Sequence, residues 1–292
     1  MKWRGQRRSE NIEDRRGAGG VRRPIGLPGG GRGGLGLGTI AIVLVVGWFL
    51  GINPLTLLGA LSGGAVPVTA ERSAAPPADD DQAAFVATVL ADTEEVWGQL
   101  FSARGDRYRD PVLVLFRDAT RSACGLGQAA MGPFYCPADQ RVYIDLGFFD
   151  TLHRRLGAPG DFAQAYVVAH EVGHHVQQLM GVTQRVDALR GRVGETEMNA
   201  LSVRVELQAD CLAGVWAHHS QRGKGWLEDG DVEEAMNAAA QIGDDTLQRR
   251  SQGRVVPESF THGTSAQRME WFQRGMVAGE VQRCDTFEAA LR

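Results

Sequence analysis

The sequence is organised around one stretch, Val167-Val168-Ala169-His170-Glu171-Val172-Gly173-His174-His175, which contains the pattern H-E-x-x-H. The surrounding residues, from Phe162 to Met180, include no proline and only one glycine, and Asp161 precedes them as a good N-cap. This composition predicts a helix of about five turns. His170 and His174 are four residues apart on that helix, so both imidazoles leave the same face and can share one metal ion.

The helix that carries the motif is apolar nearly all round, which is typical of a buried helix. Its apolar positions are Phe162, Ala165, Tyr166, Val168, Ala169, Val172, Val176 and Leu179. Two histidines and the carboxylate of Glu171 would be costly there without partners, and a bound metal accounts for all three. Glu171 projects beside the histidines, where it can act on a water at the metal, as in zinc metalloproteases. The alternative is a pair of core histidines with satisfied hydrogen bonds.

A second helix is expected to supply the third ligand, because a catalytic zinc takes three protein ligands and one water. Glu206 and Asp210 stand four residues apart in an apolar, proline-free run from Val205 to Trp216. We expect Glu206 to ligate the metal and Asp210 to hydrogen-bond a ligating histidine. The alternative is a surface helix face, which the apolar residues of the run disfavour.

His262 lies on a loop that leads into a last helix, from Gln267 to Glu280. A histidine in that position can donate a hydrogen bond to a developing oxyanion. The plainer alternative is a capped loop histidine with no part in the chemistry. The other histidines are interpreted as ordinary, and they are His153, His175, His218 and His219.

The remaining pattern predicts a helix-rich α+β domain with a small sheet. Apolar residues at helical spacing predict helices over residues 81–105 and 229–252, whereas residues 111–116 and 140–145 read as short strands. A free edge of the sheet is available to pair with an extended substrate chain. The alternative is a sheet that only covers the central helix.

The N-terminal part of the chain has the pattern of a membrane anchor. Between Arg32 and Glu71 no charged residue occurs over 38 positions, and residues 35–61 supply the roughly 20 apolar residues that a membrane helix needs. The alternative is a signal peptide cleaved after Val68-Thr69-Ala70, but the apolar run is longer than such peptides use.

The charge distribution sets the expected topology. Residues 1–33 carry nine Lys or Arg and three Asp or Glu, so the positive-inside rule places this head in the cytoplasm. We therefore expect a disordered, Gly-rich cytoplasmic tail over 1–34, a transmembrane segment over 35–61, a linker over 62–81 and an exported domain over 82–292. The membrane explains the basic head, so no nucleic-acid partner is predicted.

All four cysteines lie beyond the apolar segment, as expected for an exported domain in an oxidising compartment. Cys124 and Cys136 flank a glycine-rich loop and are placed to close it, which would leave Cys211 with Cys284. Four cysteines allow three pairings, so this pairing is a hypothesis.

Together these motifs resemble the YpfJ-type family of bacterial neutral zinc metallopeptidases over essentially the whole chain. The matching stretches are Met1-Lys2-Trp3-Arg4-Gly5, Ser9-Glu10-Asn11-Ile12-Glu13-Asp14-Arg15-Arg16, Ser122-Ala123-Cys124-Gly125, Gly132 to Gln140, His170 to Gln177, Glu206 to Cys211 and Phe260-Thr261-His262-Gly263. The resemblance implies a single-pass protein of the bacterial inner membrane with an exported zincin-like domain. H-E-x-x-H followed by E-x-x-x-D is also the gluzincin pattern, in which the glutamate is the third ligand. Thr261-His262 with Arg268 is similar to the T-H-P-x-x-x-x-R stretch of membrane-associated gluzincins, with Gly263 in place of the proline.

The predicted function is therefore that of a membrane-anchored zinc metalloendopeptidase with one Zn²⁺ per chain, acting on proteins or peptides. His170, His174 and Glu206 would hold the metal, Glu171 would be the general base and His262 would stabilise the oxyanion. The alternative is a catalytically silent, zinc-stabilised scaffold or binding protein, in which His262 is a fourth ligand.

Overall fold

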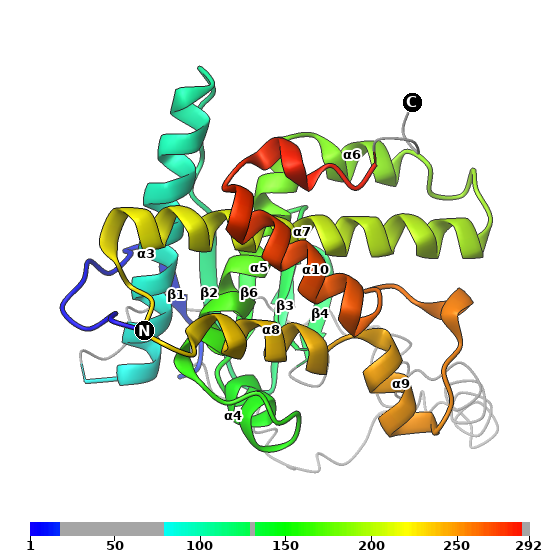
Figure 1. Cartoon of the computed structure of the whole chain (residues 1–292), viewed down its shortest axis with the longest axis horizontal. Helices are drawn as coiled ribbons and strands as arrows, with labels where there is room; N and C mark the ends of the chain where they lie inside the picture. Colours follow the sequence, from blue (N-terminus) through cyan, green and yellow to red (C-terminus); the bar gives the residue numbers. More distant parts are fainter. Residues whose placement is uncertain (18–78, 129–131, 288–292) are drawn as a thin grey trace, which may run out of the picture. The chain divides into compact units, whose positions relative to one another are not determined.

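The computed structural model describes residues 1–17, 79–128 and 132–287, and these residues have the expected helix-rich α+β architecture (Figure 1). The expected anchor, residues 35–61, lies outside the described residues, as does nearly all of the expected linker. Within the described part of the chain, no helix is long and apolar enough to cross a membrane.

The main sheet has four strands in the order β1-β2-β6-β5. Its central strands are β2 (Val112–Phe116) and β6 (Arg141–Asp145), which pair in parallel and confirm the two predicted strands. Strand β1 (Ile12–Asp14) lies parallel to β2 at one edge, and β5 (Phe134–Cys136) lies antiparallel to β6 at the other. A separate hairpin joins β3 (Ala119–Ser122) and β4 (Gly125–Gln128).

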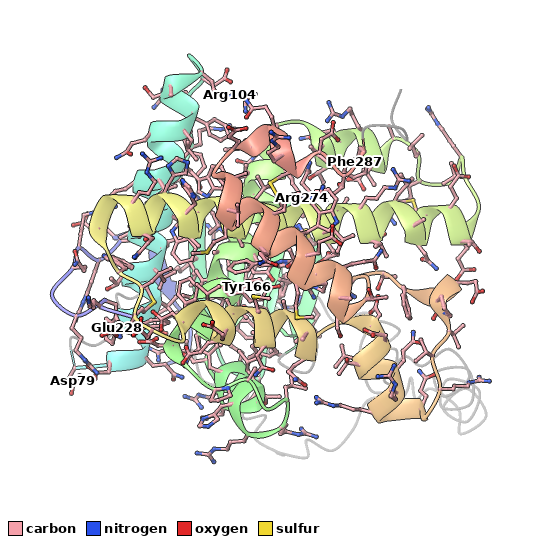
Figure 2. The ribbon with its side chains drawn as sticks, in the orientation of Figure 1. Asp79, Arg104, Tyr166, Glu228, Arg274 and Phe287 are labelled. Carbon is pink, nitrogen blue, oxygen red and sulfur yellow. A yellow bond between two sulfur atoms is a disulfide. The ribbon has the colours of Figure 1, made fainter. Side chains whose placement is uncertain are left out.

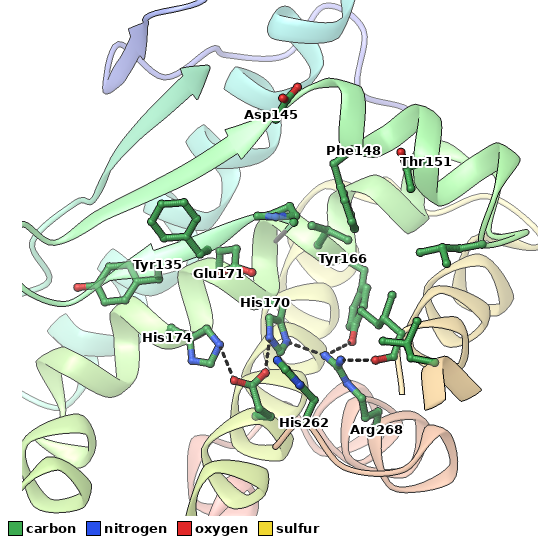
Figure 3. A pocket seen from close by; sticks show the side chains of 18 of the residues that line it. Tyr135, Asp145, Phe148, Thr151, Tyr166, His170, Glu171, His174, His262 and Arg268 are labelled. Carbon is green, nitrogen blue, oxygen red and sulfur yellow. Dashed lines mark hydrogen bonds and ion pairs between the residues drawn. The ribbon is translucent and has the colours of Figure 1, made fainter. Parts of the chain in front are cut away.

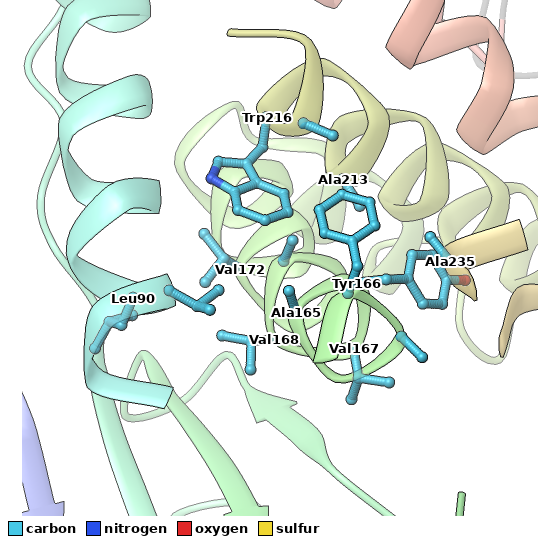
Figure 4. Packing of buried hydrophobic residues seen from close by; sticks show 14 of the residues in the cluster. Leu90, Ala165, Tyr166, Val167, Val168, Val172, Ala213, Trp216 and Ala235 are labelled. Carbon is cyan, nitrogen blue, oxygen red and sulfur yellow. The ribbon is translucent and has the colours of Figure 1, made fainter. Parts of the chain in front are cut away.

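Helix α5 (Asp161–Leu179) is the expected motif helix and lies in the middle of the core. Helices α3 (Asp81–Ala103), α7 (Glu195–Lys224) and α8 (Asp231–Gln241) pack against it, and α10 (Ser265–Ala278) packs along α7. Figure 4 shows Val168 and Val172 of α5 beside Leu90 of α3 and Trp216 of α7, all of them buried. The core therefore holds the motif helix from several sides, as its apolar surface requires.

Shorter elements complete the fold. They are α4 (Gly147–Arg154), α6 (Val182–Asp187), α9 (Asp244–Gln252), η2 (Pro257–Ser259) and η3 (Val281–Cys284). Both hypothesised disulfides are present, and they join Cys124 to Cys136 and Cys211 to Cys284. The second one ties the end of the chain to α7.

Two predicted helix features need correction. The single helix over 229–252 is instead α8 and α9, separated at Gly243. A Cβ at Gly243 would stand 2.4 Å from the backbone nitrogen of Ser265, so the chain needs glycine to approach the start of α10 there. Asp161 is the first residue of α5 and not its N-cap, which is Gly160 with a φ of 112°.

The prediction of a disordered tail over residues 1–34 is also wrong for residues 1–17. Residues 1–17 form one compact unit with the domain, and β1 belongs to the sheet. Figure 1 shows this blue segment beside α3 and β2. The glycine-rich composition that suggested disorder begins only after this stretch, and the rest of the expected tail lies outside the described residues.

Candidate metal centre

The close approach of α5 and α7 creates the site. Gly173, in the middle of the motif, faces α7, where an added Cβ would stand 3.0 Å from the carbonyl oxygen of Ala209. The absence of a side chain lets the two helix backbones come close together. Because Ala209 is one turn from Glu206, this contact brings the Glu206 carboxylate to the histidines of α5.

The three expected ligands converge as predicted. His170 Nε2 lies 3.1 Å from Glu206 Oε2, and His174 Nε2 lies 3.5 Å from Glu206 Oε1. Ligand atoms of all three side chains lie within 4.8 Å of one another. Figure 3 shows the His170 and His174 imidazoles near each other, with Glu171 beside them and His262 close to His170.

The other nitrogen of each imidazole is already engaged. His170 Nδ1 donates to Asp210 Oδ1 at 2.8 Å, which is the hydrogen bond to a histidine that we predicted for Asp210. His174 Nδ1 donates to Gln177 Oε1 at 2.8 Å, and Gln177 Nε2 donates to the Val205 carbonyl at 2.7 Å. These bonds leave both Nε2 atoms directed at Glu206, which is the arrangement of metal-binding histidines with outer hydrogen-bond partners.

This donor set fits zinc. Two imidazole nitrogens and one carboxylate form a usual protein ligand set for a catalytic zinc site with an open position. The role of Gln177 was missed, although its spacing of three residues from His174 on one helix was visible in the sequence.

A buried ion pair holds Asp210 in place. Arg268 donates from Nε to Asp210 Oδ2 at 2.8 Å and from Nη2 to Oδ1 at 2.9 Å, and both side chains are almost wholly buried. The hydroxyl of Tyr166 also donates to Asp210 Oδ1. Figure 2 shows Tyr166 in the interior, and it is fully buried. Arg268 and Tyr166 thus orient the carboxylate that orients His170.

The carboxylates of Glu171 and Glu206 have pKa values shifted in opposite directions. Burial raises the pKa of Glu171, which suits a general base. Burial acts in the same direction on Glu206, but the two imidazoles outweigh it and hold its pKa well below the ordinary value. Burial lowers the pKa of His170, whereas Asp210 and Glu206 outweigh that effect and raise it to about 10. Glu206 is therefore a ready anionic ligand, and Glu171 holds a proton more readily.

His262 faces the same cavity but stands apart from the three ligands. Asp244 Oδ2 accepts the backbone N–H groups of Thr261, His262 and Gly263 at 2.8, 2.6 and 3.0 Å, which fixes the loop. Asp244 Oδ1 lies 3.3 Å from His262 Nδ1, and this hydrogen bond raises the pKa of the imidazole. The importance of Asp244 was missed, because the sequence predicted it in the interior of a longer helix.

The cavity has a volume of about 1090 Å³ and extends well beyond the polar cluster. Its apolar lining includes Phe148, Leu156, Val167, Ile242 and Leu247. Leu247 is 37% exposed, and only Leu126 and Val277 are more exposed among the large hydrophobic side chains of the described residues. Pro133, Phe134 and Tyr135, at and beside the edge strand β5, line the cavity as well.

His175 connects the motif helix to that edge strand. Its Nε2 donates to the Arg109 carbonyl at 2.6 Å, and its Nδ1 accepts from the hydroxyl of Tyr135 at 3.0 Å. Burial lowers the pKa of His175 to about 4, so the ring is neutral. The prediction that it points away from the ligand face is correct, but the residue has a structural role that its sequence position did not reveal.

The fold and the site define a class: a helix-rich α+β protein with a largely buried His-His-Glu cluster suited to a transition-metal ion. Comparison with protein families agrees with this class. Residues 1–287 match the family described as "Putative neutral zinc metallopeptidase". The chain belongs to this family, whose description supports a zinc peptidase at the level of the family.

Relatives occur in distant bacteria. The chain is 52% identical to the uncharacterized protein YpfJ of Escherichia coli K12 over 295 residues, covering the whole of both chains. It is 42% identical to the uncharacterized protein Rv2575 of Mycobacterium tuberculosis H37Rv over 208 residues, which cover 68% of each chain. No solved protein structure shows significant similarity to the chain.

Proposed function

We propose that this protein is a zinc endopeptidase in which His170, His174 and Glu206 hold one Zn²⁺ per chain. The observation that carries the proposal is the convergence of the three ligand atoms while both histidine Nδ1 atoms are bound elsewhere. Family membership supports zinc and peptide-bond hydrolysis at the level of the class.

A bound zinc lowers the pKa of water and polarises a carbonyl group. Glu171, whose pKa burial raises, takes the proton of the attacking water and passes it to the leaving amine. His262, held by Asp244 through Nδ1, lines the cavity, and its ring is the proposed donor to the oxyanion. The hydrogen bond from Asp244 raises the pKa of His262 and so favours the protonated, donating form.

The shape of the cavity supports an extended peptide substrate. Strand β5 pairs with β6 and lies at an edge of the sheet, so its other side is available for an incoming chain. The apolar wall that includes Val167 and Leu247 supports a preference for a bulky apolar side chain next to the cleaved bond. Proteins or peptides with such residues are the proposed substrates.

The scaffold alternative has less support. A purely structural zinc has four protein ligands. Among the described residues, the cluster of converging ligand atoms contains His170, His174 and Glu206, and His262 is not part of it. Glu171 beside the open side of the cluster also has no function in a silent scaffold.

For the location, we propose attachment to the bacterial cell membrane through residues 35–61. An exported domain agrees with two disulfides, because such bonds persist in oxidising compartments.

The first test compares the wild type with Glu171→Gln, measuring zinc content and cleavage of an unfolded protein. We expect both proteins to bind one zinc, and turnover to fall about 10²–10⁴-fold in the variant, because general-base catalysis contributes that much. Unchanged turnover in Glu171→Gln would refute the proposed base. Zinc binding without cleavage in either protein would favour the scaffold.

A further inference from the structure

We propose that the domain face formed by α3 and β2 is the binding surface for the chain's own N-terminal segment, Met1–Gly17, and that this segment lies on the same side of the membrane as the domain. The inference concerns topology and does not depend on the peptidase proposal. It differs from the expectation that a basic head stays in the cytoplasm while the domain is exported.

The backbone of the segment is part of the sheet. Ile12, Glu13 and Asp14 pair in parallel register with Leu113, Val114 and Leu115. The N–H of Leu113 donates to the Asn11 carbonyl at 2.9 Å, and the N–H of Arg15 donates to the Leu115 carbonyl at 2.8 Å. Removing the segment would expose this edge of β2, whose residues from Leu113 to Phe116 are buried.

A buried carboxylate on α3 depends on the same segment. Glu94 Oε2 forms an ion pair with Arg7 at 3.0 Å, and its Oε1 accepts from the side chains of Ser9 and Asn11. Glu94 is only 8% exposed. A buried carboxylate without donors is strongly destabilising, so α3 is built to receive these three residues.

Further contacts extend along the segment. Trp3 packs edge-on against Phe85 of α3 with ring centroids 5.3 Å apart. Glu13 forms an ion pair with Arg141 of β6 at 2.6 Å, and Arg16 forms one with Asp80 at 2.6 Å. Met1 is buried, and its amino group lies 2.8 Å from Asp161 at the start of α5. The same amino group lies 3.3 Å from Asp231, so it pairs with two acidic residues of the domain.

These contacts restrict the topology. Residues 1–17 and the described residues from Asp79 onward belong to one folded unit, although the expected membrane segment lies between them in the sequence. A segment whose two ends are tied to one domain crosses a bilayer an even number of times or not at all. A single crossing would place β1 and β2 on opposite sides of the membrane. It would also remove Arg7, Ser9 and Asn11 from Glu94. A second copy cannot restore the contacts, because its own head would also lie across the membrane.

The test uses two variants of the full chain in intact bacteria, each with one added cysteine: Gln6→Cys in the segment and Glu270→Cys on the exposed face of α10. The native cysteines are all in disulfides, so the introduced thiol is the reactive one. Both variants are treated with a membrane-impermeant maleimide before and after lysis, with a cytoplasmic protein as a leakage control. We expect the two thiols to react at the same stage. Labelling of Glu270→Cys before lysis and of Gln6→Cys only after lysis would overturn the proposal.

A second measurement checks binding of the segment to α3 in the purified full chain. Glu94→Ala and the double change Ser9→Ala with Asn11→Ala should each lower the melting temperature by several degrees. Their combination should lower it by clearly less than the sum, because the same hydrogen bonds are lost in each. Strictly additive effects would show that the segment is not bound at Glu94.

Discussion

At the scale of single residues, Asp244 connects loop geometry to chemistry. One oxygen of its carboxylate holds three successive backbone N–H groups, and the other faces the His262 imidazole. Glu206 also raises the pKa of His262, and Arg268 opposes it. The protonated ring therefore persists to higher pH than that of an ordinary histidine.

Asp244→Asn should move the alkaline limb of the pH profile of kcat/KM to lower pH. The substitution removes the hydrogen bond that contributes most to the raised pKa of His262, so the ring loses its proton at lower pH. Asp245→Asn is the control, because Asp245 bonds Ser265 and not His262. An alkaline limb that stays in place in Asp244→Asn would exclude His262 as the group that titrates there.

Arg268→Ala should reduce the free energy of unfolding by about 3–5 kcal/mol, because it leaves the buried carboxylate of Asp210 without its cation. Urea unfolding measures this change. Arg274→Ala on the same helix is the matched control. Its partner Glu270 is on the surface, and a loss of about 1 kcal/mol or less is expected. Equal losses in the two variants would contradict the proposed buried anchor.

Much of the site was predictable at this scale. Residues four apart on a helix share a face, so the sequence predicts two pairs of neighbouring side chains: His170 with His174, and Glu206 with Asp210. Gln177 follows the same rule and was overlooked. Asp244 was not predictable in this way, because its hydrogen bonds cross from α9 to a loop 17 to 19 residues further along.

At the scale of elements, the contact between α7 and α10 brings together Asp210 and Arg268, the ion pair that orients His170. A Cβ at Gly214 would stand 2.1 Å from the Phe272 carbonyl, and one at Gly275 would stand 1.9 Å from the Cys211 carbonyl. The two glycines let the helix backbones touch. Asp210 on α7 and Arg268 on α10 meet because of this close approach.

Gly214→Ala should destabilise the protein by about 1–3 kcal/mol, because the added methyl group forces these helices apart. Gly223→Ala on the same helix meets no atom within 4 Å and should be neutral or stabilising by up to about 1 kcal/mol. Thermal or urea unfolding of both variants gives the comparison. A neutral Gly214→Ala would mean that the contact does not limit the approach of the helices.

Element prediction succeeded where the pattern was local. Helices α3 and α5 were predictable from their apolar periodicity, and strands β2 and β6 from their short apolar runs. None of these predictions depends on contacts between distant residues. Strand β1 escaped prediction because Ile12-Glu13-Asp14 is short and largely charged, and it is a strand only because β2 pairs with it. The break between α8 and α9 likewise depends on the distant contact of Gly243 with Ser265.

At the scale of the whole molecule, the basic N-terminal segment changes the interpretation of the chain. Composition alone suggested a solvated tail, because charged residues near an apolar run usually flank a membrane. The structure instead uses Arg7, Glu13 and Arg16 in ion pairs with the domain. Pairing over such sequence distances leaves no local pattern, so the domain boundary could not be predicted from the sequence.

The central claim is that His170, His174 and Glu206 form an open zinc site. X-ray absorption at the zinc edge of the zinc-loaded full chain tests it most directly, with His262→Ala as the comparison. We expect one zinc with two imidazole ligands at about 2.0–2.1 Å and oxygen ligands, and the same spectrum in His262→Ala. Three imidazoles that fall to two in His262→Ala would reveal a closed, structural site, and a chain that binds no zinc would contradict the account.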